Sequence, residues 1–274
     1  MLKEKLNALL RIDRRWIFLG LTVVLFGAIM RPLGLINKEI SKDTRNAYDF
    51  MEKLPAGSFV ILSLDYDPST APELNPQAVA VARHAFRKNL RVGVVTYAAG
   101  ATGLIEQLFA VVPAEFKKEY GRDYIIFPYQ PSAVAALTQM ASDLYGIYDK
   151  DKDGKDAKSM PVMLGVKNYK NISLVVCIAG TQMPTYWVQY AGDKYGVPVM
   201  AGVTAISQPG YGPYLQKKQL KGLLGGMKGA AEYEHLIDTP GKGTSGIDAL
   251  SLAHVMVVGL IIVSNIAMVI LKYL

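Results

Sequence analysis

The sequence has few of the residues on which catalytic and metal sites most often depend. Its 274 residues include one cysteine and three histidines. The lone Cys177 cannot form an intramolecular disulfide and fits either redox compartment. His84 and His235 fall in predicted helices and His254 falls in an apolar stretch. We therefore expect no bound metal and no Ser-His-Asp triad.

Nucleotide-binding motifs are also absent. No G-x-G-x-x-G follows the first predicted strand, and no G-x-x-x-x-G-K-[ST] occurs, which argues against dinucleotide and P-loop sites. The formal net charge is +7, but residues 1–15 hold five bases and two acids, and Arg31 and Lys272 add one base each. Because this excess lies beside apolar segments, it favours attraction to anionic lipid, and we expect no nucleic-acid partner.

Long hydrophobic runs, in contrast, are present at both ends. Hydrophobic residues make up 51% of the chain, and the excess lies in residues 16–30, extended past Arg31 to Ile36, and in residues 250–271. Each reaches the roughly 20 residues that a bilayer requires. No small-residue cleavage site follows the first run. We predict a two-pass plasma-membrane protein with spans 16–36 and 250–272.

Charge around the spans predicts their orientation. The flank 1–15 is basic and Lys272 lies at the C-terminal end of the second span, which favours a cytoplasmic location for both termini. Basic residues also follow the first span, but long loops cross membranes with little regard to charge. We expect the region between the spans to be extracytoplasmic.

Between the spans, apolar runs alternate with helical patterns. The predicted strands are 59–64, 91–96, 124–127, 172–179, 197–203 and 220–224. The predicted helices are 76–89, 104–120, 133–148, 185–195, 211–219 and 227–237. Short Val- and Ile-rich runs separated by helices are typical of a parallel sheet covered on both faces. We predict a Rossmann-like, doubly wound, mainly parallel α/β domain at 58–237, joined to the spans by a linker or helix at 37–57 and a flexible linker at 238–249.

Ligands of such sheets bind beyond the carboxyl ends of the strands. The predicted ligand-binding rim consists of the polar or small residues that follow the strands: Tyr97, Gly100, Tyr129, Gln130, Thr181, Gln182, Thr204, Ser207 and Lys228. This rim carries little fixed charge and suits a small polar ligand or a protein surface.

The first strand ends in the sequence Asp65-Tyr-Asp67-Pro-Ser. It resembles the first motif of the haloacid-dehalogenase-like phosphohydrolases, and the strand ending at Thr96 resembles their second. The resemblance implies Asp65 as nucleophile, Asp67 as acid/base, Thr96 as the phosphate-holding residue, and Mg²⁺ as cofactor.

The acidic motif that this family carries after the fourth strand is missing. Residues 178–185 read IAGTQMPT, with Thr181 and Thr185 where acids are expected. Magnesium would keep too few oxygen ligands. We therefore expect the two aspartates to cap a loop and the next helix, with no cofactor, and keep the Mg²⁺-dependent phosphohydrolase as the alternative.

The second span contains small and polar residues, Gly259, Ser264 and Asn265. Lipid disfavours such groups, and another helix would satisfy them. That helix could be the first span of the same chain, or it could belong to another membrane subunit or a second copy.

Residues 64–88 and 213–236 resemble an uncharacterised group of prokaryotic membrane-anchored α/β proteins. Residues 197–222 are similar to one lobe of type-1 periplasmic binding proteins, and residues 92–101 faintly resemble crotonase-fold peptidases, although a nucleophile and base are missing. We expect a membrane-anchored, non-catalytic subunit that binds a ligand or partner as a scaffold or sensor.

Overall fold

The computed structural model describes residues 2–31, 34 and 40–273. The chain divides into two compact units: Lys38–Gly243, and Met1–Asn37 together with Thr244–Leu274. Residues 32–33 and 35–36 of the predicted first span, and residues 37–39 of the predicted linker, lie outside the described residues.

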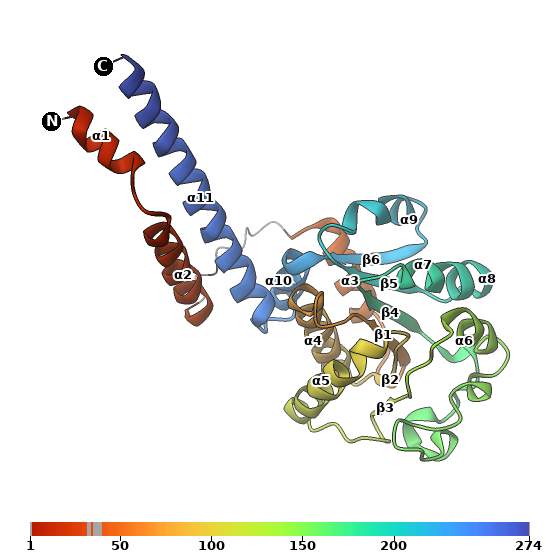
Figure 1. Ribbon diagram of the computed structural model, residues 1–274. Helices are drawn as coiled ribbons and strands as arrows, with labels where there is room; N and C mark the ends of the chain where they lie inside the picture. The colour runs from red at the N-terminus through yellow and green to blue at the C-terminus, as the bar shows by residue number, and fades with distance from the viewer. Residues whose placement is uncertain (1, 32–33, 35–39, 274) are drawn as a thin grey trace. The chain divides into compact units, whose positions relative to one another are not determined.

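The larger unit is built on a six-stranded sheet (Figure 1). Its strands are β1 (Phe59–Asp65), β2 (Arg91–Val95), β3 (Tyr124–Ile126), β4 (Leu174–Ala179), β5 (Val199–Val203) and β6 (Leu220–Gly225). The order is β3-β2-β1-β4-β5-β6, and every pairing is parallel. The predicted Rossmann-like parallel sheet is confirmed, with all six strands.

The helices of the chain differ more from the prediction. They are α1 (Leu2–Leu10), α2 (Arg14–Met30), α3 (Lys42–Glu52), α4 (Ala71–Arg87), α5 (Thr102–Glu115), α6 (Ala133–Gln139), α7 (Met183–Trp187), α8 (Asp193–Tyr195), α9 (Gly212–Gln216), α10 (Gly226–Leu236) and α11 (Lys242–Tyr273). The predicted helix 133–148 stops at Gln139. The predicted helix 185–195 contains a π-helical turn at Val188–Gly192 and ends where Gly196 adopts φ 73°.

Helices cover both faces of the sheet, as a doubly wound fold requires (Figure 1). Val60, Leu62 and Leu64 of β1 pack in one cluster with α3, α4, α5 and α10. Phe59 and Ile61 pack in a second cluster with α6 and α7. Alternate side chains of a strand point to opposite faces, so β1 contributes to both clusters.

A buried histidine ties α3 to the domain. The Nε2 of His84 lies 2.7 Å from a carboxylate oxygen of Glu52, and its Nδ1 lies 2.8 Å from the Tyr233 hydroxyl. The ring of Tyr48 stacks on the imidazole at 4.8 Å. Burial lowers the pKa of His84 to about 4, although the Glu52 hydrogen bond opposes the shift. Helix α3 lies in the segment 37–57, for which the sequence predicted a linker or helix outside the α/β domain, and it is a packed part of that domain.

The smaller unit contains the apolar helices. Among the described residues, α11 is the helix long and apolar enough to cross a membrane. Helix α2 starts where Asp13 accepts a hydrogen bond from the Arg15 amide, and it ends at Met30. Arg31 leaves the helical conformation because proline follows it. The apolar part of α2 is therefore shorter than the predicted span 16–36, at roughly 22 Å against the ~30 Å of a bilayer core.

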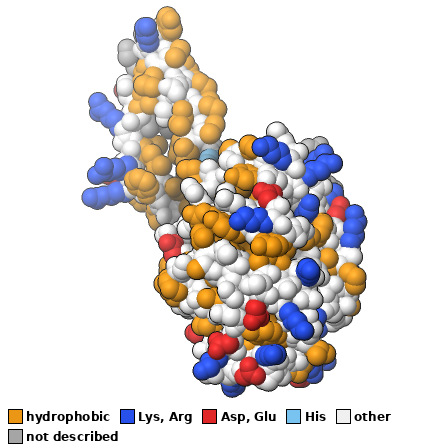
Figure 2. All heavy atoms as spheres, turned by 90° about the vertical axis from the view of Figure 1, so that its right-hand side faces the viewer, with side chains coloured by type: hydrophobic (Ala, Val, Ile, Leu, Met, Phe, Trp, Pro, Cys, Tyr) orange, Lys and Arg blue, Asp and Glu red, His pale blue; other side chains and the backbone are white. Residues whose placement is uncertain are grey.

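Figure 2 shows one face of the molecule. Basic and acidic side chains are interspersed on the domain, whereas hydrophobic side chains cover much of the surface of the apolar helices. Many of these exposed apolar side chains belong to α2 and α11, for example Phe18 at 62% and Val255 at 70%.

The close approach of α3 to β6 gives a test of this packing. A Cβ at Gly222 would overlap the backbone of Ala47 in α3. We expect Gly222→Ala to lower the free energy of unfolding by roughly 3 kcal/mol, measured by denaturant titration of the full chain in detergent. Gly103→Ala is the control, because a Cβ there meets no atom within 4 Å. Equal stability of the two variants would contradict this packing.

Candidate functional site

The centre of the sheet is the expected ligand position in this fold. The strand order reverses between β1 and β4, and ligands of open α/β sheets bind outside the carboxyl ends of the strands at that point. Asp65 ends β1, and its backbone oxygen accepts a hydrogen bond from Gly180, which follows β4. The two strand ends are therefore directly joined.

Asp65 is buried, at 1% exposure, and its carboxylate accepts hydrogen bonds from neighbouring groups. The Ser63 hydroxyl donates to Oδ2 at 2.5 Å, and the Tyr97 amide donates to Oδ1 at 2.6 Å. The Cys177 thiol lies 3.7 Å from Oδ2. Trp187 of α7 in turn donates to the Ser63 hydroxyl at 2.8 Å. One carboxylate thus joins β1, β4, the loop after β2 and, through Ser63, α7.

Burial dominates the electrostatics of this network. It raises the pKa of Asp65 to about 6, and the hydrogen bonds from Ser63 and Tyr97 oppose the shift. Burial, followed by the nearby Asp65 charge, raises the pKa of Cys177 well above its usual value. The thiol therefore remains protonated and can donate.

Asp67 lies in a different environment, on the surface. Its Oδ1 accepts hydrogen bonds from the Ser69 amide at 2.9 Å, the Ser69 hydroxyl at 2.6 Å and the Thr70 amide at 3.2 Å. The hydroxyl bond is the main cause of a lowered pKa for Asp67. The carboxylate thus accepts the hydrogen bonds of the amides just before α4, at the position where nucleotide-binding proteins of this fold hold a phosphate.

The three residues of the phosphohydrolase alternative do not form one open site. Thr96 is 2% exposed, and its hydroxyl donates to the Leu64 oxygen at 2.7 Å. Asp65 is also buried, whereas Asp67 is exposed. Within the described part of the chain, no group of three or more His, Cys, Asp and Glu side chains could hold a metal ion. The geometry favours a structural role for these residues.

An open groove lies beside this closed centre, beyond β4 and β5. It measures about 560 Å³ and is lined by Gly180, Thr181, Gln182, Thr185, Ile206, Ser207, Gly210, Tyr211 and Tyr214. None of the lining side chains is charged. The rings of Tyr211 and Tyr214 are tilted by 41° with centroids 5.9 Å apart. Hydroxyl, amide and aromatic groups suit a neutral ligand that offers both hydrogen bonds and apolar surface.

Helix α4 holds one of the two loops that form the groove, the loop after β5, and also the start of α10. The Gln77 amide donates to the Val203 oxygen at 3.1 Å and to the Gly226 oxygen at 2.9 Å. Glu73 accepts from the Ala205 amide at 2.8 Å. The loop after β5 and the start of α10 are therefore tied to the helix that follows β1.

The groove contains part of the predicted rim. Thr181, Gln182 and Ser207 line it, and the buried Thr204 donates to the Ser207 hydroxyl at 3.0 Å. The other predicted rim residues, Tyr97, Gly100, Tyr129, Gln130 and Lys228, lie outside it. Among these, Gln130 donates to the Ile147 oxygen at 3.3 Å and Lys228 pairs with Glu232 at 3.7 Å.

The sequence did not identify Tyr211 and Tyr214 as groove residues. Both fell in the predicted helix 211–219, of which only α9 (Gly212–Gln216) is α-helical. The glycine- and proline-rich stretch PGYGPY, which contains both tyrosines, could have indicated an exposed turn with aromatic side chains.

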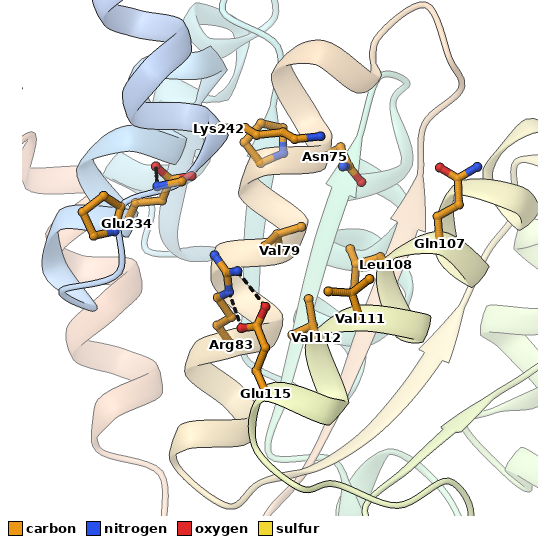
Figure 3. A pocket seen from close by; sticks show the side chains of 13 residues that line it. Asn75, Val79, Arg83, Gln107, Leu108, Val111, Val112, Glu115, Glu234 and Lys242 are labelled. Carbon is orange, nitrogen blue, oxygen red and sulfur yellow. Dashed lines mark hydrogen bonds and ion pairs between the residues drawn. The ribbon is translucent and has the colours of Figure 1, made fainter. Parts of the chain in front are cut away.

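A second hollow lies on the layer of helices between α4 and α5 (Figure 3). It measures about 310 Å³, and Val79, Leu108, Val111 and Val112 form its apolar wall. Arg83 and Glu115 point toward each other across it and form a two-bonded ion pair at 2.7 and 2.8 Å. Since this hollow is bridged by a satisfied ion pair and contains few of the residues that directly follow the strands, the groove beyond β4 and β5 is the better candidate site.

The residues predicted as membrane-helix contacts do not share one face. At about 100° per residue, Gly259 lies roughly 120° from Asn265 around α11. Ser264 and Asn265 line a hollow together with neighbouring apolar side chains, and Gly259 is not among them. Ser264 and Asn265 therefore lie together and Gly259 lies on another side of α11, and their contact with another membrane helix stays a prediction.

Comparisons with known proteins add little to this geometry. No family model and no curated protein matches the chain. It is similar to the C-terminal domain of a glycosyl transferase group 1 family protein (LpcC) from Francisella tularensis, with 11% identity, a TM-score of 0.30, and coverage of 62% of this chain and 69% of that one. A likeness of this size carries no argument about the fold or function of this chain.

The raised pKa of Asp65 predicts how stability depends on pH. Between about pH 4 and pH 6 the folded chain keeps a proton on Asp65 that the unfolded chain loses. The free energy of unfolding therefore falls as pH rises through this window, by roughly 3 kcal/mol for a shift of about two pKa units. We expect Asp65→Asn to remove this fall, as measured by denaturant titrations from pH 4 to pH 7.

Asp67→Asn is the matched control. Asp67 is exposed and its pKa is lowered, so its titration acts in the opposite direction. Parallel stability profiles for the parent chain and Asp65→Asn would show that Asp65 is not a strongly shifted group.

Proposed function

We propose that the chain is a membrane-anchored, non-catalytic subunit whose α/β domain binds a neutral polar ligand or a partner protein, as a scaffold or sensor. The observation that carries the proposal is the state of Asp65. A carboxylate that is 1% exposed and accepts donors at both oxygens is not available to attack a substrate.

The groove beyond β4 and β5 is the proposed binding surface. It lies at the edge of the sheet where this fold places its ligands, and its wall offers the hydroxyl groups of Thr181 and Ser207 and the amide of Gln182. With no charged lining side chain, it favours an uncharged ligand over a phosphate or carboxylate.

The anchor is proposed to be two-pass, with the bilayer as a constant partner. Helix α11 supplies the long span. Helix α2 packs on it closely enough that a Cβ at Gly20 would lie 3.1 Å from the Met256 methyl carbon. The shorter α2 is accommodated by local thinning of the bilayer and by the arginines at its start, which extend toward the headgroups.

The first test is gentle extraction of the full chain from its native membranes. We expect a discrete particle larger than the 29.9 kDa of one chain, with a co-purifying component that a Gln182→Ala/Tyr214→Ala variant loses. Tyr195→Ala is the matched control, because Tyr195 is 54% exposed and lies outside the groove. Size analysis and mass spectrometry give the readout.

The same preparation decides between the proposal and the Mg²⁺-dependent phosphohydrolase. Asp65→Asn should leave the particle intact, because asparagine has nearly the same size and keeps one acceptor oxygen for the Tyr97 amide. Release of phosphate from p-nitrophenyl phosphate that requires Mg²⁺ and is abolished by Asp65→Asn would overturn the non-catalytic function and support Asp65 as nucleophile, with Asp67 and Thr96 beside it.

The orientation in the membrane is tested separately. The basic flank before α2 favours cytoplasmic termini and an extracytoplasmic domain. Lys155 is exposed, and the native Cys177 is buried. We expect Lys155→Cys to react with a membrane-impermeant maleimide in intact cells, while the parent chain does not. Labelling that requires permeabilised cells would place the domain in the cytoplasm.

A further inference from the structure

The polar side chains in the second half of α11 lie on one stripe of the helix. At about 100° per residue, positions spaced i, i+3, i+4, i+7 and i+8 share a face. The residues at this spacing are Val257, Leu260, Ile261, Ser264 and Asn265, and with Ile17 of α2 they line a groove of about 420 Å³. We refer to the five residues of α11 as the polar stripe.

The closest approach of α2 to α11 lies on the side of the helix opposite Asn265, although Ile17 of α2 borders the groove beside the polar stripe. Gly20 of α2 approaches Met256, and Ala267 is only 1% exposed. Met256 lies nine residues before Asn265 and Ala267 lies two after it, which places both roughly 160–180° away around the helix. Pairing of the two helices within the chain therefore leaves Asn265 exposed.

Most other polar side chains in these helices are satisfied locally. Thr22 donates to the Phe18 oxygen at 2.8 Å, and Ser251 donates to the Ile247 oxygen at 2.8 Å. The Nδ1 of His254 lies 2.8 Å from the Leu250 oxygen. The Asn265 carboxamide, in contrast, makes no hydrogen bond to any described residue. In hydrocarbon such a group requires a partner, since water is absent.

We propose that the polar stripe pairs with the polar stripe of a second copy of this chain, an inference that rests on the membrane anchor of the proposed function. Copies of one chain insert in the same direction, so their α11 helices are parallel and their Asn265 residues lie at the same depth. A carboxamide both donates and accepts hydrogen bonds. Two Asn265 side chains related by a two-fold axis therefore satisfy each other.

A second copy explains the stripe better than an unrelated helix does. An unrelated partner would need its own polar side chain at this depth. A second copy supplies that group and the matching apolar neighbours, Val257, Leu260 and Ile261, by symmetry. The spacing of the stripe also suits the shallow, left-handed crossing common among membrane helices.

Cysteine crosslinking of the full chain in native membranes tests the geometry. Ile261→Cys places a thiol on the polar stripe, and Val263→Cys places one about 160° away at similar exposure, 47% against 54%. Mild oxidation should convert Ile261→Cys chains to disulfide-linked dimers and leave Val263→Cys chains largely monomeric. Equal dimer yields at the two positions, or none at Ile261→Cys, would overturn the pairing.

Substitution of Asn265 tests the hydrogen bond. In the Ile261→Cys chain, Asn265→Leu should weaken dimerisation roughly tenfold, whereas Asn265→Gln should retain it because the carboxamide is kept. An unchanged dimer yield in Asn265→Leu would contradict the role of Asn265.

An alkaline carbonate wash of the same membranes separates this inference from the anchor. A chain that resists the wash but does not crosslink through Ile261→Cys would overturn the pairing alone. A chain that the wash removes would overturn the anchor and the pairing together.

Discussion

The hydrogen bonds to the Asp65 carboxylate fix the centre of the sheet, and the rest of the domain depends on them. The donors come from three places in the chain: Ser63 beside it on β1, the Tyr97 amide after β2, and the Cys177 thiol on β4. A buried charge is tolerated only when donors surround it. Because these donors occupy the carboxylate, the point where this fold ordinarily binds its ligand is filled by the protein itself.

Because the sheet centre between β1 and β4 is filled, the candidate site lies beyond the next pair of strands, β4 and β5. The loop after β5 and the start of α10 are held by Gln77 and Glu73 of α4, the helix that begins after the Asp67 turn. The turn that resembled a catalytic motif thus starts the helix that shapes the groove. A rigid helix positions loops more accurately than loops position themselves, so Asp67 contributes to the shape of the groove by ordering the turn before α4.

Strands were predicted well from the sequence, and contacts were not. β1, β4 and β5 are buried along their whole length, so each appears as an unbroken apolar run. The environment of Asp65 depends on Tyr97 and Cys177, which are 32 and 112 residues away, and no local pattern encodes such distances. A position just after a strand shows that a residue lies at the rim; it does not show which way the side chain points. For this reason Thr181, Gln182 and Ser207 meet in the groove, whereas Lys228 does not.

Asp65 and Asn265 lead to opposite conclusions for the same physical reason. Asp65 is buried in the domain, and Asn265 lies in hydrocarbon under the proposed membrane anchor; in both settings the free energy depends on whether each donor and acceptor has a partner. Asp65 accepts hydrogen bonds at both carboxylate oxygens from groups within the domain, so it belongs to the folded core and requires no ligand or partner chain. Asn265 has no partner among the described residues, while Thr22, Ser251 and His254 lie within hydrogen-bond distance of carbonyls one turn away. Under the proposed pairing, the Asn265 carboxamide of a second copy satisfies this group, and the chain needs no further polar residue to do so.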